Sequence, residues 1–172
     1  FVPVIELSPH AQAMPAFVLE RALAQARCWQ DAGHSLVMSV NISAANLIES
    51  GFGQSVEAGL RRYGLAPWQL ELEVTESAIM QNAEQARRQL DLLAAAGIRL
   101  AIDDFGTGYS SLAYLQDIPA HVVKIDQSFV RKLADGERER SLVHSMIHLS
   151  HDLGYRVVAE GIETAEAADQ VR

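Results

Sequence analysis

Two adjacent aspartates, Asp103 and Asp104, stand at the end of a short apolar run, residues 98–102. Such a run is typical of a buried parallel strand, and the carboxyl ends of parallel strands are where α/β sheets and barrels place their chemistry. Neighbouring side chains on a regular strand point to opposite faces. The backbone must therefore bend or end there if both carboxylates are to reach one site. Because two like charges repel, we expect one or two divalent cations to compensate them.

Potential ligands also follow the other apolar runs of the chain. The five strand candidates are residues 36–40, 70–74, 98–102, 121–123 and 156–159. The side chains at or near their ends are Asn41, Glu73, Asp103, Asp104, Lys124, Glu160 and Glu163. A single acid at a strand end is usually a helix cap or a surface group, but five such ends in succession favour a functional cluster. Oxygen donors without histidine suit Mg²⁺, Mn²⁺ or Ca²⁺ and disfavour zinc and copper.

This set of residue types suits two kinds of chemistry. Two cations ~3.5–4 Å apart are the usual device for in-line attack of water on a phosphodiester. A nearby lysine would then hold the water or neutralise developing negative charge. Carboxylates, Mg²⁺ and a lysine base also serve enolate chemistry. The spacing of the residues does not separate these two alternatives.

Helical segments lie between most of the strand candidates. Three apolar stripes, each followed by a glycine, predict them: Val56, Leu60 and Tyr63 before Gly64; Ala86, Leu90 and Leu93 before Gly97; Leu142, Met146, Leu149 and Leu153 before Gly154. A shorter helix is predicted near residues 110–116. Strands that alternate with helices predict an α/β fold with a parallel sheet.

The predicted fold is a TIM-like (β/α)8 barrel, here an incomplete piece with about five βα units. The 172 residues are 49% hydrophobic and form one domain, whereas a complete barrel of this type needs ~250 residues. We expect the chain, residues 1–172, to lack strands at both ends. On that expectation the isolated piece is inactive and marginally stable, because open sheet edges are left unpaired.

The motifs of the chain resemble those of the EAL-domain family, the cyclic di-GMP-specific phosphodiesterases. The matching stretches are residues 39–43, 72–77, 102–112, 123–126 and 158–164, which include Asp-Asp-Phe-Gly-Thr-Gly and Ala-Glu-Gly-Ile-Glu. The resemblance implies hydrolysis of cyclic di-GMP to linear pGpG with Mg²⁺ or Mn²⁺. It also implies a homodimer of the intact domain, and sensory or GGDEF-type domains as further parts of the full-length protein.

The resemblance also implies a role for each strand-end residue. Asn41, Glu73 and Asp103 would bind one metal ion, and Asp103, Asp104 and Glu160 the second. Lys124 would contact the nucleophilic water, so that Lys124, Glu160 and Asp104 form the catalytic set. Glu163 would lie beside the substrate, with Asn41, Asp104 and Lys124 as further substrate contacts.

One family feature is missing. The Glu-Ala-Leu motif is absent, and it should precede residues 1–3. Because every other motif is intact, we interpret this as truncation rather than degeneration. The alternative is a catalytically inactive EAL domain that acts as a cyclic di-GMP receptor or a protein-interaction module. A third hypothesis, an unrelated Mg²⁺-dependent enolase-like lyase, is disfavoured by the Asp-Asp-Phe-Gly-Thr-Gly loop.

Glu76 and the loop Gly106-Thr107-Gly108 are predicted to act together. Glu76 follows the second strand candidate, from where its carboxylate can accept hydrogen bonds from the loop. The loop lacks the Lys-Ser/Thr of a phosphate-binding P-loop, so we interpret it as a hinge next to Asp104. Through this loop Glu76 would hold Asp104 in place.

Several other features are predicted to have no part in the site. His144, His148 and His151 share one helix face, which we expect to be exposed and opposite the Leu142 stripe. The single cysteine, Cys28, excludes an internal disulfide and is expected to be buried. The net charge of −8 argues against a nucleic-acid polymer as partner. It is compatible with a phosphorylated ligand if metal ions supply positive charge. We expect a cytoplasmic domain, whether or not the full-length protein is tethered to a membrane.

Overall fold

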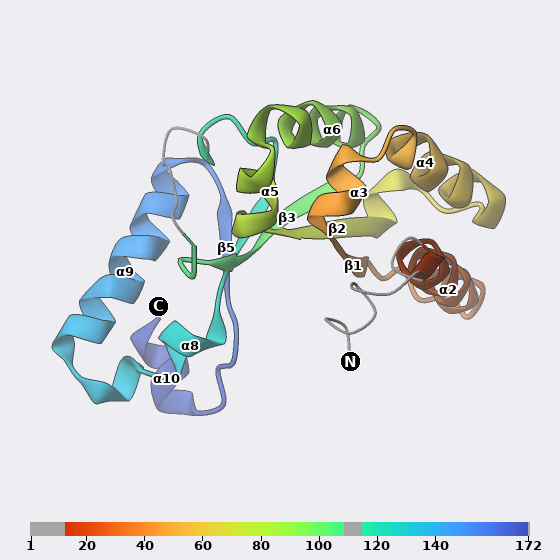
Figure 1. Ribbon diagram of the computed structural model, residues 1–172. Helices are drawn as coiled ribbons and strands as arrows, with labels where there is room; N and C mark the ends of the chain where they lie inside the picture. The colour runs from red at the N-terminus through yellow and green to blue at the C-terminus, as the bar shows by residue number, and fades with distance from the viewer. Residues whose placement is uncertain (1–12, 109–114, 172) are drawn as a thin grey trace.

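A computed structural model describes residues 13–108 and 115–171 of this protein (Figure 1). Its centre is a five-stranded sheet in which every neighbouring pair is parallel and the strand order follows the chain. The strands are β1 (Met38–Ile42), β2 (Leu70–Thr75), β3 (Arg99–Phe105), β4 (Val122–Ile125) and β5 (Arg156–Ala159). The predicted α/β architecture with five parallel strands is therefore confirmed.

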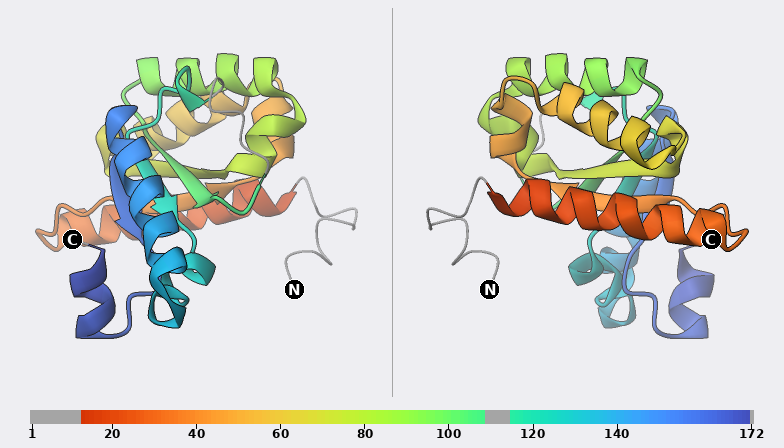
Figure 2. Two further views of the ribbon diagram at one scale, coloured as in Figure 1. Left: turned by 90° about the vertical axis from the view of Figure 1, so that its left-hand side faces the viewer. Right: turned by 90° about the vertical axis from the view of Figure 1, so that its right-hand side faces the viewer.

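Helices and short 3-10 turns connect the strands. They are α2 (Ala13–Asp31), α3 (Ala44–Ile48), α4 (Phe52–Tyr63), η1 (Pro67–Gln69), α5 (Glu76–Gln81), α6 (Ala83–Ala95), α8 (Gln127–Val130), η2 (Leu133–Asp135), α9 (Glu137–Asp152) and α10 (Ala165–Gln170). Helix α2 packs beside β1, and α9 packs beside β5 (Figures 1 and 2). The helix predicted near residues 110–116 falls mostly on residues 109–114, outside the described residues.

The core lies between the sheet and the helices that cover it. Leu72 and Ile102 of adjacent strands and Leu90 of α6 are completely buried. These residues belong to the apolar runs and stripes that predicted the elements, because burial of apolar area is what selects a strand or helix face. Among the described residues, no helix is both long and apolar enough to cross a membrane.

Two side-chain placements differ from the expectation. The buried face of α9 contains Val143, Met146 and Ser150, whereas Leu142 is exposed. The sequence carries two overlapping apolar stripes, and packing against β5 and α8 selects the one with Val143. Cys28 is exposed rather than buried, because α2 turns Leu23 and Ala26 to the core and residue 28 lies about 200° around the helix from residue 26. His144, His148 and His151 are exposed, as predicted.

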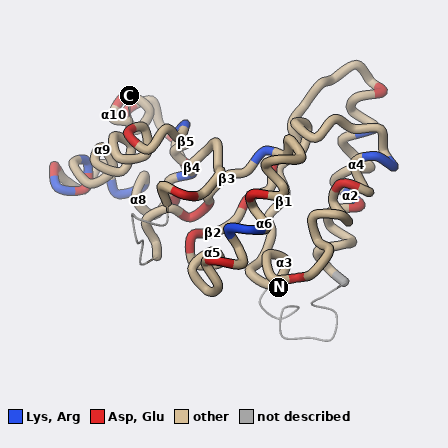
Figure 3. Tube along the Cα trace, turned by 90° about the horizontal axis from the view of Figure 1, so that it is seen from above, with Lys and Arg blue, Asp and Glu red and all other residues tan. Residues whose placement is uncertain are grey.

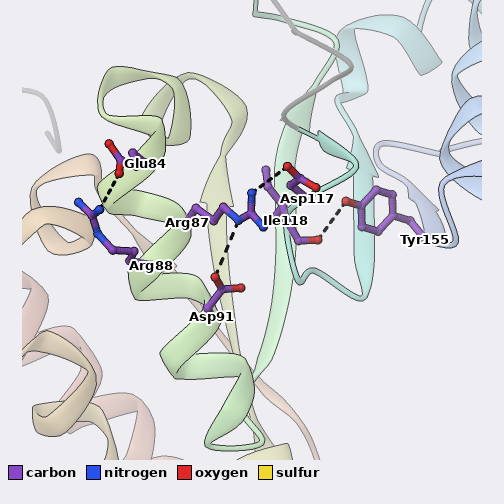
Figure 4. Close-up of polar contacts among 7 residues, drawn as sticks. All are labelled: Glu84, Arg87, Arg88, Asp91, Asp117, Ile118 and Tyr155. Atoms are coloured by element: carbon purple, nitrogen blue, oxygen red, sulfur yellow. Dashed lines mark hydrogen bonds and ion pairs between the residues drawn. The ribbon is translucent and has the colours of Figure 1, made fainter.

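Tyr155 ties the start of β5 to the segment that precedes β4. Its buried hydroxyl donates toward the carbonyl oxygen of Ile118 at 3.1 Å (Figure 4). The same hydroxyl also contacts the carbonyl oxygen of Leu115. Arg87 of α6 reaches the same segment through a 2.8 Å ion pair with Asp117, but both side chains are about half exposed. Exposed ion pairs contribute little to stability, so Tyr155 is the stronger of the two attachments.

Replacing Tyr155 by phenylalanine should therefore destabilise the protein by about 1–3 kcal/mol, because a buried hydrogen-bonding group is left without its partner. The measurement is the free energy of unfolding in urea. Tyr63→Phe is the matched control, since the Tyr63 hydroxyl donates to the half-exposed Glu20 at 2.7 Å and water can replace it. Equal destabilisation by the two substitutions would contradict the stabilising role of the buried Tyr155 hydroxyl.

Candidate active site at the strand ends

A bulge in β3 brings the two adjacent aspartates to the same region. Ile102 pairs with Val123 and Phe105 with Ile125, so that Asp103 and Asp104 together stand opposite one residue of β4, Lys124. Two residues opposite one is the defining feature of a β-bulge. Asp104 has a φ of 53°, a left-handed conformation that few non-glycine residues adopt. The backbone thus bends at the aspartates, while the strand continues to Phe105.

Lys124 is the centre of the site. Its Nζ atom lies 3.1 Å from Glu73 Oε2, 3.4 Å from Asp103 Oδ1 and 2.5 Å from Glu160 Oε1. These carboxylates come from β2, from β3 and from the residue after β5. Burial alone would lower the pKa of Lys124, but its hydrogen bonds to Glu160 and Glu73 outweigh burial and raise that pKa above its ordinary value. Lys124 is therefore firmly protonated at neutral pH.

Asp104 experiences an excess of negative charge. Burial raises its pKa, and the charges of Asp103, Asp126 and Glu160 raise it further, while Lys124 opposes them. One ammonium group therefore does not balance all the acids at this end of the sheet. Acidic positions on the neighbouring strands β2 and β3 can be followed from above in Figure 3. A further cation would relieve this repulsion.

Asp126 also belongs to this region, although it is not among the site residues predicted from the sequence. It follows β4, and its Oδ1 atom accepts a 2.9 Å hydrogen bond from the backbone N–H of Ser128 at the start of α8. This interaction with Ser128 lowers the pKa of Asp126, so its charge persists beside Asp104. The signal in the sequence was its place at a strand end, which it shares with the assigned residues.

Five of the proposed site residues come together, and two lie at the margins. The five are Glu73, Asp103, Asp104, Lys124 and Glu160. Asn41 pairs with Glu73 across β1 and β2 and is exposed. Glu163 instead lies 3.5 Å from Arg131, with both side chains mostly exposed. Glu163 and Arg131 line a cavity of about 250 Å³ between the α8–η2 segment and α10.

Every acidic side chain of the cluster, and also Asn41, offers an oxygen atom. Oxygen is the ligand type that a hard divalent cation prefers. Within residues 13–108 and 115–171, however, no three His, Cys, Asp or Glu side chains are grouped so as to hold a metal ion. The carboxylates of Glu73, Asp103 and Glu160 converge on the Lys124 ammonium group instead. Metal binding would require some of these side chains to turn away from Lys124.

Glu76 contacts the loop that follows the aspartates. Its side chain is almost fully buried, and Oε2 accepts a 3.3 Å hydrogen bond from the backbone N–H of Gly106. Gly108 also approaches Glu76, since a Cβ atom on Gly108 would lie 3.3 Å from Glu76 Oε1. The hydroxyl of Thr107 donates to the carbonyl oxygen of Asp104 at 2.8 Å. Hydrogen bonds thus connect Glu76 to the loop and the loop back to Asp104.

The charge balance around Lys124 generates a pH-dependent prediction. Lys124→Met removes the group that lowers the pKa of Asp104, so this pKa should rise further above its unfolded value. A group whose folded pKa is raised stabilises the protein below its unfolded pKa and loses that contribution as the pH rises through the folded pKa. The melting temperature of Lys124→Met should therefore fall more, relative to wild type, at pH 7 than at pH 4.

Both melting temperatures should be measured in the presence of a chelator, so that no metal ion replaces the lost charge. Lys132→Met is the control, because Lys132 is exposed. A decrease for Lys124→Met that is the same at both pH values would contradict the assigned charge balance.

Comparison with known proteins identifies relatives over the whole chain. The family model described as EAL domain matches residues 1–172. The bifunctional diguanylate cyclase/cyclic di-GMP phosphodiesterase MucR of Pseudomonas aeruginosa is 40% identical over 165 residues, which are 95% of this chain and 24% of that protein. The signaling protein YkoW of Bacillus subtilis is 40% identical over 149 residues, which are 87% of this chain and 19% of that protein. The chain thus spans about a quarter or less of these relatives.

Solved structures show the same arrangement of elements. The PaMucR phosphodiesterase in its c-di-GMP complex matches with a TM-score of 0.94 and 38% identity, over 99% of this chain and 70% of that one. The Klebsiella pneumoniae BlrP1 calcium/cyclic di-GMP complex matches with a TM-score of 0.85 and 30% identity, over 96% of this chain and 42% of that one.

Proposed function

Because the chain belongs to the EAL domain family, we propose that the protein hydrolyses cyclic di-GMP to linear pGpG at the strand-end cluster, as part of bacterial second-messenger signalling. The observation that carries this proposal is the convergence of Glu73, Asp103 and Glu160 on Lys124. The relatives named above include a cyclic di-GMP phosphodiesterase and a c-di-GMP complex, which supports the choice of substrate.

The state of Lys124 favours phosphodiester hydrolysis over enolate chemistry. A lysine that abstracts a proton from carbon must lose its own proton first, and the raised pKa of Lys124 opposes that loss. A permanently charged ammonium is instead suited to orient a water molecule and to stabilise negative charge on phosphate oxygens. Glu160, whose Oε1 atom lies 2.5 Å from Lys124 Nζ, and Asp104 complete the proposed catalytic set with Lys124.

Mg²⁺ or Mn²⁺ fits the oxygen donors of the site. Asn41, Glu73 and Asp103 would hold one ion, and Asp103, Asp104 and Glu160 the other. Two bound ions would lower the pKa of the attacking water and offset charge on the attacking and leaving oxygens. Asn41, Asp104, Lys124 and Glu163 would contact the substrate. Glu163 is free to do so if it leaves its long, exposed contact with Arg131.

The direct test is an assay of pGpG formation from cyclic di-GMP by the full-length protein in Mg²⁺ or Mn²⁺. Hydrolysis that stops on addition of a chelator is the expected result. Binding of cyclic di-GMP without hydrolysis would instead indicate a receptor or an interaction module. Failure to bind or to cleave cyclic di-GMP would overturn the proposal.

Asp103 and Lys124 should differ in their effect on metal affinity. Asp103→Asn should weaken metal binding strongly, because Asp103 is proposed to contact both ions. Lys124→Ala should lower kcat while metal affinity is kept or increased, because a competing positive charge beside three carboxylates is removed. Calorimetric titration of both variants with Mn²⁺ makes the comparison. Equal loss of metal affinity would remove Lys124 from its proposed role.

Glu76 and Glu73 should differ in their response to Mg²⁺. Glu76 bonds to the loop at Gly106, so Glu76→Ala should reduce activity by ~10–100-fold, as is typical of residues that hold a metal ligand in place. High Mg²⁺ should partly restore the rate, because the ligands themselves remain. Glu73→Ala should not recover, since a proposed ligand is gone. The measurement is the hydrolysis rate against Mg²⁺ concentration, and a Glu76→Ala rate equal to wild type throughout would refute the loop-holding role.

A further inference from the structure

Gly106 contacts the rest of the protein on two sides. The contact on one side is polar, and the contact on the other side is apolar. On the polar side its backbone N–H donates to Glu76. On the other side a Cβ atom at this position would lie 2.4 Å from Met146 Cε and 3.1 Å from Phe129 Cε2. The φ of Gly106 is 95°, so a side chain would be disfavoured by conformation as well as by space. The backbone of the loop therefore rests directly on the two apolar side chains.

Met146 and Phe129 come from helices that follow β4, far from the loop in sequence. Phe129 lies in α8, where its N–H donates to the carbonyl oxygen of Asp126 at 3.1 Å. Met146 lies on the buried face of α9, and the end of β3 runs beside this helix in Figure 1. We refer to Phe129 and Met146 as the loop seat.

The loop seat can affect the position of Asp104, because the glycine that it contacts is close to Asp104 along the chain. Gly106 is two residues from Asp104, which is already in a left-handed conformation at the bulge. The hydrogen bond that the Gly106 N–H donates to Glu76 limits movement of the loop in one direction only. Without a surface behind it, the loop could move away from Glu76 and take Asp104 with it. A displacement of about 1 Å in a catalytic group is enough to reduce a rate ~100-fold.

We propose that Phe129 and Met146 are positioning residues that press Gly106 against Glu76 and so fix the Asp103–Asp104 bulge. Helix α9 would thereby act on the site without contributing a ligand to it. The unbranched thioether of methionine suits this role because it fills an irregular gap beneath a backbone turn. The effect on catalysis rests on the proposed phosphodiesterase function, whereas the effect on the loop does not.

The test compares three variants of the full-length protein. Met146→Ala removes the contact with Gly106, and Met146→Leu keeps an apolar side chain of similar volume. Val143→Ala is the matched control, because Val143 is buried in the same helix but the atoms nearest to a Cβ atom placed on Gly106 belong to Met146 and Phe129. Thermal unfolding identifies any variant that loses its overall fold.

The first readout is hydrogen–deuterium exchange of the segment 103–108. Met146→Ala should increase its exchange at least ~10-fold, because the Gly106 N–H is released from Glu76. Met146→Leu and Val143→Ala should exchange like wild type. An unchanged segment in Met146→Ala, or an equal increase in Val143→Ala, would overturn the proposal whether or not the protein cleaves cyclic di-GMP.

The second readout is the affinity for Mn²⁺ by calorimetry together with the hydrolysis rate. Met146→Ala should weaken both by ~10–100-fold, since the bulge carries two proposed ligands, and Met146→Leu should restore them. Wild-type affinity and rate in Met146→Ala would show that the seat does not position the carboxylates. Absence of hydrolysis in the wild-type protein would count against the proposed function, while the exchange measurement would still decide the role of the seat.

Discussion

The charge balance at Lys124 is the constraint on which the rest of this site depends. A parallel sheet gathers the carboxyl ends of its strands at one edge, and here three of those ends supply carboxylates that lie within 3.4 Å of one ammonium group. Without a cation among them, these acids would repel one another in a partly buried setting. Even with Lys124 the balance is incomplete, because the pKa of Asp104 stays raised.

The backbone at this edge is arranged to satisfy the same constraint. A regular β3 would turn Asp103 and Asp104 to opposite faces. The bulge places both opposite Lys124 instead, at the expense of a left-handed conformation at Asp104. The hydrogen bonds of Glu76 and Thr107 hold the strained segment from one side. Phe129 and Met146 meet it from the other. Polar and apolar contacts therefore act on the same short loop.

The arrangement also explains how one lysine can be surrounded by potential metal ligands. In the described residues the ammonium group satisfies the carboxylates, and no three acidic side chains are set to hold a metal ion. A divalent cation and Lys124 would then compete for the same oxygens. The binding of a metal ion would redistribute the carboxylates and leave Lys124 free to face a phosphate group. Catalysis by such a site would depend on side-chain rearrangement at fixed strand positions.

The sequence alone determined the strands, the alternation with helices and the oxygen-rich chemistry of the strand ends. These follow from local patterns, because apolar runs, periodic stripes and glycine stops are set by neighbours along the chain. Gly64, Gly97 and Gly154, predicted as helix stops, all have positive φ. The position of Glu76 after β2 was enough to anticipate a hydrogen bond to the Gly106 loop.

The tertiary structure alone decided how these pieces meet. It placed Val143 rather than Leu142 of α9 in the core, because the two overlapping apolar faces of that helix differ only in what packs against them. It also left Cys28 of α2 exposed. It placed Asp126 beside Asp104 and the loop seat beneath Gly106. It also made Lys124, rather than an aspartate, the centre of the cluster. These contacts join residues about 20 to more than 50 positions apart, and no local pattern encodes a distance between side chains on different strands.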